Sequence, residues 1–409
     1  MSELPQPYPR SSTGRPLRVL LVEVNEDGTI GGSHQVLLDV VRRLDRRFVE
    51  PVVLFYQDNP VADRLRQLSV DVKVLEDLRR REVTRYRASN RFIRYGGLIG
   101  AIATRARFLG RHRIDLVHIN NSPQVAFYDW LPAARARRVP IVVSAMGDAG
   151  PIEGRVRRSL TRTYSHYIAV SEYMRRALIS QGIPSSRITL VQNGIDAARI
   201  RSRIRRNPEV IRGALDVRPD QILGLMVGNI RRWKGQHVVL EALARLPIEI
   251  RGQIVIAFAG AHDETGLDYQ GELEATTRKL KLTPQIRWLG RREDIPDLFN
   301  AADFGLHASI VPEPFGLVMV ECMATGTPVI AAQEGGAAEI VTAETGWVYP
   351  GGDAEALASL LRTFPLQRKF FQRFVEACQD RAGQFDAAVM AEGVQDVYLK
   401  LSGGRRRWK

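Results

Sequence analysis

Residues 313–331 have the sequence Glu-Pro-Phe-Gly-Leu-Val-Met-Val-Glu-Cys-Met-Ala-Thr-Gly-Thr-Pro-Val-Ile-Ala, with carboxylates at Glu313 and Glu321. Eight residues are about two helical turns, so this spacing predicts that both carboxylates lie on one side of a helix. Ionised carboxylates only accept hydrogen bonds, and such a pair suits the hydroxyl groups of a sugar or a ribose. Gly316 permits close approach of the backbone to a ligand. The start of the predicted helix, from Phe315 to Leu317, is expected to receive phosphate oxygens.

On both sides of this stretch, short β-branched runs alternate with amphipathic segments of helix length. This pattern predicts parallel sheets with crossover helices. The expected strands are 18–24, 52–56, 70–75, 114–119, 141–145, 167–170, 222–227, 254–259, 286–289, 304–307 and 328–331. Ser171 is predicted to be the N-cap of a helix over 172–180, and a further helix is predicted over 236–246.

The chain has 409 residues, which is too long for one ordinary hydrophobic core. The strand-helix pattern restarts after an irregular basic stretch near residue 200. We therefore expect four parts, which are a flexible leader (1–16), a first Rossmann-like domain (17–200), a second one (201–384), and a C-terminal helix that crosses back and ends in a basic tail (385–409). Ligands bind at the carboxyl ends of strands in doubly wound domains, so a deep cleft between the two sheets is predicted.

The net charge is +14, which implies an anionic partner. Between Arg79 and Arg113 there are eleven arginines and one acid, Glu82, interleaved with aromatic and aliphatic residues. This stretch has three interpretations, which are a solvated helical face, a surface that docks on anionic lipid, and a nucleic-acid site. No nucleic-acid-binding module accompanies it, so nucleic acid ranks last.

The number of cysteines and the hydropathy of the chain indicate the cellular compartment of the protein. The chain has two cysteines, Cys322 and Cys378, and no apolar run long enough to span a membrane. A disulfide framework is not expected, and Cys322 is predicted to be a buried apolar residue. The pattern favours a cytoplasmic protein that is peripheral on the inner face of the membrane if the arginine stretch binds lipid.

Several segments, taken in order, resemble glycosyltransferase family 4, the retaining enzymes of GT-B fold. Residues 313–321 resemble the family's Glu-x7-Glu signature. The other segments that carry the resemblance are Gly31-Gly32-Ser33, Leu116-Val117-His118, Val170-Ser171-Glu172, Val191-Gln192-Asn193-Gly194-Ile195-Asp196, Val227-Gly228-Asn229, Lys234-Gly235, and Gly335-Gly336 with Glu339. Glu-x7-Glu by itself is more typical of a solvated helix, and the order of all the segments is what carries the resemblance.

The resemblance implies a role for each matching residue. Glu313 would hold hydroxyls of the donor sugar, and Glu321 the ribose hydroxyls. Lys234 would neutralise the leaving diphosphate. His118 would lie near the C6 hydroxyl of the sugar or the reacting centre, unless it is a satisfied strand-end histidine. The donor site would also include the amides of Gly31, Gly32, Phe315, Gly316 and Leu317, with Glu339 as a weaker candidate.

Two departures from the family pattern are visible. Many relatives have an arginine where this chain has Asn229, so Arg231 or Arg232 is expected to supply the second cation. Relatives often carry histidines where this chain has residues 144–148, Ser-Ala-Met-Gly-Asp. The acceptor side is therefore harder to predict than the donor side.

The implied function is retaining transfer of a sugar, of the hexosyltransferase type, from a UDP- or GDP-sugar co-substrate to a sugar or lipid-linked acceptor, with no cofactor. No Asp-x-Asp motif occurs. A lysine and helix-terminal amides can supply a metal's electrostatic role, so metal independence and no metal ligands are predicted. No nucleophile is evident, which favours front-side attack by the acceptor. Two alternatives are an epimerase of nucleotide-sugars with the same fold and a catalytically silent scaffold.

Overall fold

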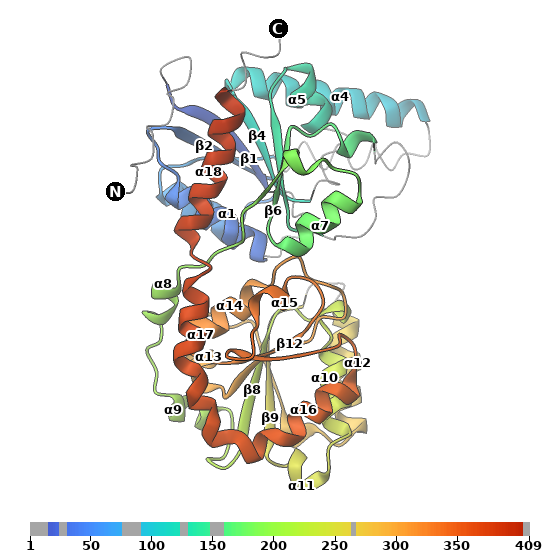
Figure 1. Ribbon diagram of the computed structural model, residues 1–409. Helices are drawn as coiled ribbons and strands as arrows, with labels where there is room; N and C mark the ends of the chain where they lie inside the picture. Colours follow the sequence, from blue (N-terminus) through green and yellow to red (C-terminus); the bar gives the residue numbers. More distant parts are fainter. Residues whose placement is uncertain are drawn as a thin grey trace, which may run out of the picture. The chain divides into compact units, whose positions relative to one another are not determined.

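The computed structural model describes residues 15–23, 31–75, 91–122, 130–147, 159–262 and 267–403 (Figure 1). The chain forms two compact units. Unit 1 comprises Met1–Asn193 and Ala387–Lys409, and unit 2 comprises Gly194–Asp386. Residues 194–200 and 385–386 thus belong to unit 2 rather than to the flanking parts expected from the sequence. Most of the predicted leader and of the basic tail lies outside the described residues.

Unit 1 contains a seven-stranded parallel sheet in the order β3-β2-β1-β4-β5-β6-β7. Its strands are β1 (Leu17–Glu23), β2 (Val49–Phe55), β3 (Asp71–Val74), β4 (Leu116–Asn121), β5 (Ile141–Ala145), β6 (His166–Ala169) and β7 (Ile188–Leu190). Its described helices are α1 (Gly32–Arg43), α2 (Pro60–Gln67), α4 (Arg91–Arg111), α5 (Trp130–Ala136), α7 (Glu172–Ser180) and α18 (Ala387–Gly403), with a 3-10 turn at Ser185–Arg187.

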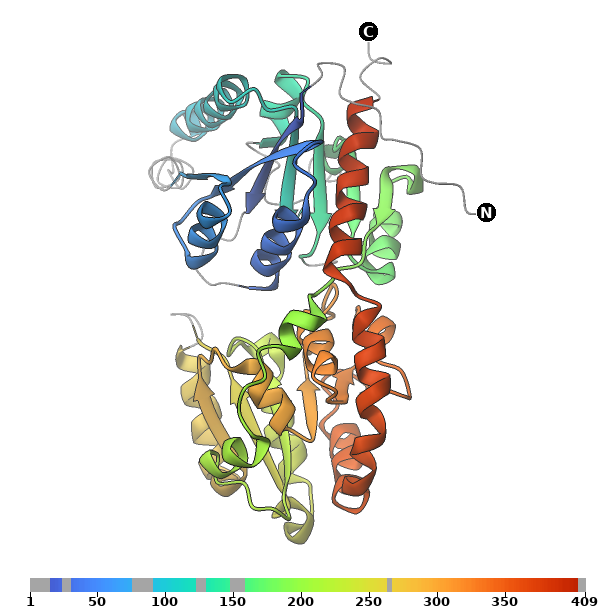
Figure 2. The same cartoon turned by 90° about the vertical axis from the view of Figure 1, so that its left-hand side faces the viewer.

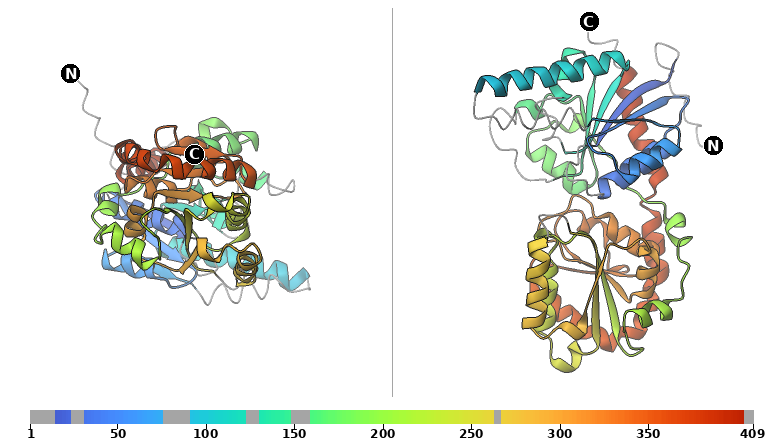
Figure 3. Two further views of the ribbon diagram at one scale, coloured as in Figure 1. Left: turned by 90° about the horizontal axis from the view of Figure 1, so that it is seen from below. Right: turned by 180° about the vertical axis from the view of Figure 1, so that it is seen from behind.

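Helices pack in two groups against this sheet. α1 contacts both α2 and α18, while α4 and α5 lie side by side (Figures 2 and 3). Sheet strands covered on both faces are expected to be apolar throughout, and Val19, Leu20, Leu21 and Val22 in β1 are all completely buried. The predicted helix over 172–180 is confirmed, including its N-cap, because the Ser171 hydroxyl accepts the Met174 amide proton.

Unit 2 contains a six-stranded parallel sheet in the order β10-β9-β8-β11-β12-β13. Its strands are β8 (Ile222–Val227), β9 (Ile254–Ala259), β10 (Ile286–Gly290), β11 (Phe304–His307), β12 (Val329–Ala332) and β13 (Gly346–Tyr349). Its α-helices are α8 (Ala197–Arg201), α9 (Pro208–Ala214), α10 (Gln236–Ala244), α11 (Ile248–Arg251), α12 (Leu267–Lys279), α13 (Ile295–Ala301), α14 (Leu317–Ala324), α15 (Ala337–Ile340), α16 (Ala354–Gln367) and α17 (Phe374–Gly383). Shorter 3-10 turns are η3 (Arg232–Lys234), η4 (Thr283–Gln285) and η5 (Arg368–Arg373).

The strand order places one topological switch point in each sheet. β1 pairs with β2 on one side and with β4 on the other, and β8 pairs in the same way with β9 and β11. Chain connections leave a switch point in opposite directions, which opens a crevice at the carboxyl ends of the two central strands. In unit 2 the switch point lies at the ends of β8 and β11, after Val227 and His307, where the predicted donor residues follow.

The last helix, α18, belongs to unit 1 although α17 belongs to unit 2. It packs on α1, and its Gln395 side chain accepts a hydrogen bond from the Asp45 amide at 2.8 Å. Tyr398 of α18 is fully buried, and its hydroxyl lies 2.5 Å from Nδ1 of His118 in β4. α18 is therefore part of the core of unit 1.

Candidate donor site in unit 2

Glu313 does not lie on the helix that carries Glu321, so the prediction of two carboxylates on one helical face is wrong. α14 begins at Leu317, and its N-cap Gly316 is left-handed with φ of 102°. Glu313 lies before this turn and forms an isolated parallel bridge with Gly335. A left-handed residue cannot continue a right-handed helix, so α14 starts after Gly316 and Glu313 lies outside it. The expected start of the helix near Leu317 is confirmed.

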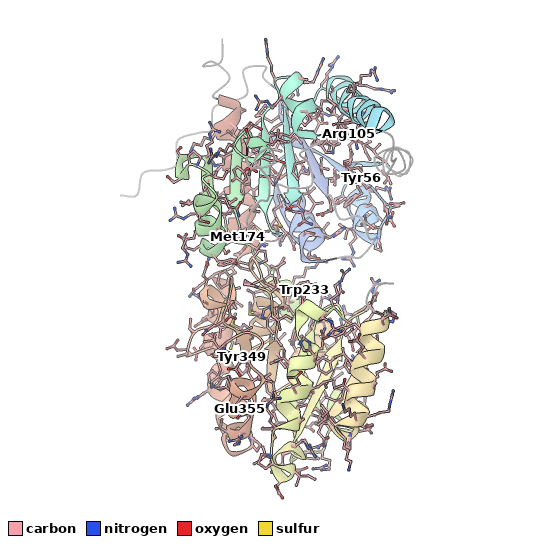
Figure 4. The ribbon with its side chains drawn as sticks, turned by 90° about the vertical axis from the view of Figure 1, so that its right-hand side faces the viewer. Tyr56, Arg105, Met174, Trp233, Tyr349 and Glu355 are labelled. Carbon is pink, nitrogen blue, oxygen red and sulfur yellow. The ribbon has the colours of Figure 1, made fainter. Side chains whose placement is uncertain are left out.

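Lys234 closes the short η3 turn that follows β8. The next residue, Gly235, has φ of 78°, and a Cβ there would lie 1.9 Å from the Ala308 carbonyl oxygen. Only glycine fits this close approach, which ties the turn after β8 to the segment after β11. The Lys234 ammonium also lies 4.3 Å from the ring centre of Trp233, which is 38% exposed (Figure 4).

The Glu313 carboxylate collects three partners on one oxygen. Oε1 pairs with the Lys234 ammonium, accepts the Ser309 hydroxyl at 2.5 Å, and lies 3.1 Å from Nε2 of His307. Among the described residues, Oε2 has no hydrogen-bond partner, and the Glu313 side chain is 12% exposed. One carboxylate oxygen is thus saturated by the protein while the other is left for a ligand.

The charge state of Glu313 follows from these contacts. Burial raises the pKa of the Glu313 carboxyl, but the charge of Lys234 and the contact with His307 lower it by more, and the net pKa is well below its usual value. Glu313 is therefore ionised at neutral pH and acts as a hydrogen-bond acceptor.

Two helices of at least eight residues begin beside this carboxylate. α10 starts after Gly235 and α14 after Gly316, and neither N-cap glycine supplies a capping side chain. The amide protons of a first helical turn lack partners within the helix and carry partial positive charge. Together with Lys234, these two helix starts favour an anionic group at the carboxyl ends of β8 and β11.

Arg231 and Arg232, the two candidates for the second cation after Asn229, have different surroundings in the structure. Arg232 pairs with Glu272 of α12, and its guanidinium lies 4.8 Å from the ring centre of Tyr269. Arg232 is thus held on the surface of α12, while Arg231 is half-buried at the start of η3. Asn229 accepts a hydrogen bond on its carbonyl from Gln236. The assignment of the second cation to Arg231 or Arg232 stays a prediction.

The remaining donor-site candidates fall into two groups. Glu321 is on α14 and Glu339 on α15, and both side chains are half-buried. The Phe315 ring is buried and packs edge-on against Phe385, so its side chain points away from any ligand and only its backbone can contribute. Gly336 donates its amide to the Glu313 carbonyl at 2.8 Å, which holds the post-signature loop against this segment.

His118 lies apart from this group, inside unit 1. β4 continues to Asn121, so His118 is in the middle of the strand and not at its end. The side chain is 2% exposed, and its ring nitrogens contact the hydroxyls of Tyr398 at 2.5 Å and Ser144 at 2.8 Å. These contacts fit the alternative of a satisfied interior histidine and leave no ring nitrogen for a sugar.

Gly31 and Gly32 are also in unit 1, where Gly31 caps α1 and Gly32 begins it. The predicted N-terminal glycine turn therefore does start a helix, at the carboxyl end of β1. Glu23, the last residue of β1, accepts a hydrogen bond from Asn120 of β4 at 2.5 Å. Both side chains are buried, which marks the switch point of unit 1 as polar.

Three residues that contact predicted site residues were not predicted from the sequence. They are His307 and Ser309, which contact Glu313, and Tyr398, which contacts His118. His307 was expected only as the last residue of a strand. In the sequence, His307 ends a predicted strand and Ser309 follows it shortly before Glu313, and neither position carries a distinctive pattern. Cys322 is buried as predicted, and burial raises the pKa of its thiol. In the part of the chain that the structure describes, no group of three or more metal-ligating side chains occurs.

Comparison with known families matches both units. A model described as Glycosyltransferase Family 4 matches residues 30–199, and one described as Glycosyl transferases group 1 matches residues 208–381. The chain belongs to this glycosyltransferase family. The resemblance inferred from the short segments is thereby confirmed. The two parallel sheets are those of the GT-B fold, as predicted.

Solved structures of the family cover nearly the whole chain. HepE of Anabaena, solved with UDP-glucose, is 25% identical, with a TM-score of 0.76 over 93% of this chain and 99% of that chain. A glycosyltransferase from Rickettsia africae is 19% identical, with a TM-score of 0.77 over 94% of this chain and 98% of that one. The Rickettsia protein supports the fold alone.

A curated relative is the D-inositol 3-phosphate glycosyltransferase 2 of Catenulispora acidiphila. It is 31% identical over 229 residues, which are 54% of this chain and 52% of the relative. The chain thus matches about half the length of this family member.

The environment of His118 predicts a pH dependence of stability. Burial lowers the pKa of His118 from 6.5 to about 3, so between these values the unfolded chain binds a proton that the folded chain excludes. The free energy of unfolding should fall as the pH drops below 6.5, at up to about 1.4 kcal/mol per pH unit. Urea unfolding at a series of pH values should show a shallower fall for His118→Gln. His262→Gln, at an exposed histidine, should behave as wild type, and equal slopes for all three would contradict the assignment.

Proposed function

We propose that this chain transfers a sugar from a UDP-sugar donor to an acceptor hydroxyl, with retention of the anomeric configuration. The observation that carries the proposal is the Lys234–Glu313 pair at the carboxyl ends of β8 and β11. A buried pair of charges is costly to maintain unless its partners are well placed, and this one lies at the switch point where doubly wound domains bind ligands.

The donor fits this site group by group. Lys234 has three ammonium donors and gives one to Glu313, so two remain for diphosphate oxygens. The first-turn amides of α10 and α14 add partial positive charge, although the His237 amide already donates to the Tyr269 hydroxyl. Oε2 of Glu313 is placed to accept a sugar hydroxyl, and Glu321, about one turn into α14, is assigned to the ribose.

UDP-glucose is the first donor to test. HepE, which matches 93% of this chain, was solved with that compound. GDP-sugars remain the alternative donor class. An epimerase would convert the donor without an acceptor, and a silent scaffold would bind no donor, so one assay separates the three functions.

The chemistry follows from where charge develops. The bond between the anomeric carbon and the diphosphate oxygen breaks, and Lys234 with the helix amides stabilises the leaving diphosphate. The acceptor hydroxyl attacks the same face of the oxocarbenium-like centre, and its proton passes to the departing phosphate oxygen. Unit 1 is proposed to bind the acceptor.

The acceptor is proposed to be sugar- or lipid-linked and reached from an anionic membrane surface. On α4, the Ile99 side chain is 68% exposed. Arg107 and Arg111 are also exposed, and because they are four residues apart they lie on the same face of the helix. An exposed aliphatic residue on the same helix as exposed arginines favours a lipid interface over a plain solvated face. The arginines at 79–87 lie outside the described residues, as do the side chains of Arg91 and Arg94.

Arg105 is not part of the exposed surface of α4. Its side chain is 2% exposed, and its guanidinium lies 5.6 Å from the ring centre of Trp130 (Figure 4). Arg105 is therefore a core residue that joins α4 to α5, and it is not available to phosphate groups. In the described part of the chain, no helix is long and apolar enough to cross a membrane.

The donor assignment predicts the loss of transfer when either charge is removed. Lys234→Met should lower kcat with UDP-glucose by about 100-fold or more, because the leaving diphosphate loses its cation. Glu313→Gln should lower kcat/KM by a similar factor. Lys279→Met and Glu249→Gln change exposed residues and should match wild type. A chromatographic transfer assay measures these rates, and undiminished transfer by Glu313→Gln would refute the assignment.

Metal independence is tested in the same assay. Prior dialysis against EDTA should leave the rate of transfer unchanged, because Lys234 and the helix amides supply the charge. A loss of rate that is restored by adding Mg²⁺ or Mn²⁺ would show that a cation takes part.

The lipid interface is tested by vesicle sedimentation. The double variant Arg107→Ser, Arg111→Ser should bind vesicles rich in phosphatidylglycerol about 30-fold more weakly than wild type, at roughly 1 kcal/mol for each arginine. The control is Arg64→Ser, Arg176→Ser, which removes the same charge from exposed positions elsewhere in unit 1. Equal loss of binding in both double variants would mean that vesicle binding depends on net charge alone. The assignment of α4 as the lipid interface would then be wrong.

A further inference from the structure

His307 is an unusual residue in the interior of unit 2. It ends β11, it is 4% exposed, and in the described chain its Nδ1 is buried without a hydrogen-bond partner. A buried polar atom without a partner costs about 1–3 kcal/mol, so a histidine at this position calls for a compensating contact. The contact is made by the other ring nitrogen, at 3.1 Å from Oε1 of Glu313.

The contact fixes which proton the ring carries. An ionised carboxylate only accepts hydrogen bonds, so Nε2 of His307 must be the donor. In the neutral ring, Nδ1 is then the acceptor, and a proton added there would be a buried N–H without an acceptor. Nε2 is therefore a ring nitrogen that carries a proton.

The partners of Glu313 also fix the orientation of its carboxylate. The Ser309 hydroxyl reaches the same Oε1 at 2.5 Å and lies 3.4 Å from Nε2 of His307. Lys234 reaches this oxygen as well, but it is the group that the proposed function assigns to the diphosphate. When Lys234 turns its two other donors to phosphate, His307 and Ser309 still donate to Oε1 alongside it.

Backbone geometry leaves room for this arrangement. Gly316 has φ of 102°, and a Cβ there would lie 3.9 Å from Nε2 of His307 and 2.3 Å from the end of the Met319 side chain. The left-handed turn thus lets the chain before α14 pass over the histidine ring. It sets Glu313 on the ring edge and the start of α14 beside it.

We infer that His307 is a positioning residue, whose Nε2–H holds Oε1 of Glu313 so that Oε2 is presented to a hydroxyl of the donor sugar. The inference rests on the proposed function, because it needs Glu313 to bind the sugar. It assigns His307 to recognition of the sugar and not of the nucleotide. Variants of His307 should therefore weaken binding of UDP-glucose while leaving the affinity for UDP unchanged.

The test compares two amides of different reach. Nε2 of glutamine is as many bonds from the backbone as Nε2 of histidine, whereas the amide nitrogen of asparagine corresponds to the unpartnered Nδ1. By calorimetry, His307→Gln should bind UDP-glucose within about twofold of wild type. His307→Asn should bind it about tenfold more weakly, as expected for losing a hydrogen bond to a charged group. Both should bind UDP as wild type does, which also shows that unit 2 is folded.

A matched control is His166→Asn, at a buried histidine in unit 1 whose Nε2 lies 2.8 Å from the Thr189 hydroxyl. It should bind UDP-glucose as wild type does. Equal affinities of His307→Asn and His307→Gln for UDP-glucose would overturn the inference, and so would parallel losses for UDP and UDP-glucose. The proposed function fails differently, because wild type itself would then gain no affinity from the glucose group and Glu313→Gln would change nothing.

Discussion

The Lys234–Glu313 ion pair is the interaction on which the proposed donor site depends. Two charges this far from solvent are costly unless each has a nearby counter-charge and hydrogen bonds. The surrounding backbone is shaped to provide them. Gly235 brings the turn after β8 onto the segment after β11. Gly316 has a left-handed conformation and separates Glu313 from the start of α14. The pair is thus a consequence of two left-handed glycines at one switch point.

The two units resemble each other in topology but differ in what fills their switch points. In unit 2, the carboxyl ends of the central strands carry a partly exposed charged group with one free acceptor oxygen. In unit 1, Glu23 and Asn120 are buried against each other, and His118 is enclosed by Tyr398 and Ser144. α18 supplies Tyr398, so the C-terminal end of the chain completes the core of unit 1.

Periodicity predicted most of the strands because parallel strands buried on both faces are continuous apolar runs. The strands Ile222–Val227, Ile254–Ala259 and Phe304–His307 have the predicted bounds. The error at Glu313 has a physical cause. Spacing alone assigned a helix to both carboxylates, whereas the conformation of Gly316 decides where α14 begins. Likewise, no local pattern shows that Arg105 faces inward, because its partner Trp130 is contributed by another helix.

Contacts between residues far apart in sequence explain the rest. The resemblance identified Lys234 and Glu313, which are 79 residues apart, but only the fold shows them bound to each other. His307 and Ser309 complete that group, and Tyr398 reaches His118 across 280 residues. A histidine in a strand has no sequence signature that separates a ligand contact from an interior hydrogen bond. The structure places His118 between two hydroxyl groups in unit 1 and His307 beside the Glu313 carboxylate in unit 2, a difference that the sequence does not show.

A crystal structure of the chain with UDP-glucose is the most direct measurement of the central claim. The account predicts diphosphate oxygens within hydrogen-bond distance of the Lys234 ammonium and a glucose hydroxyl on Oε2 of Glu313, with Oε1 still held by His307 and Ser309. A nucleotide bound away from the carboxyl ends of β8 and β11, or a Glu313 that contacts only protein in the complex, would contradict it.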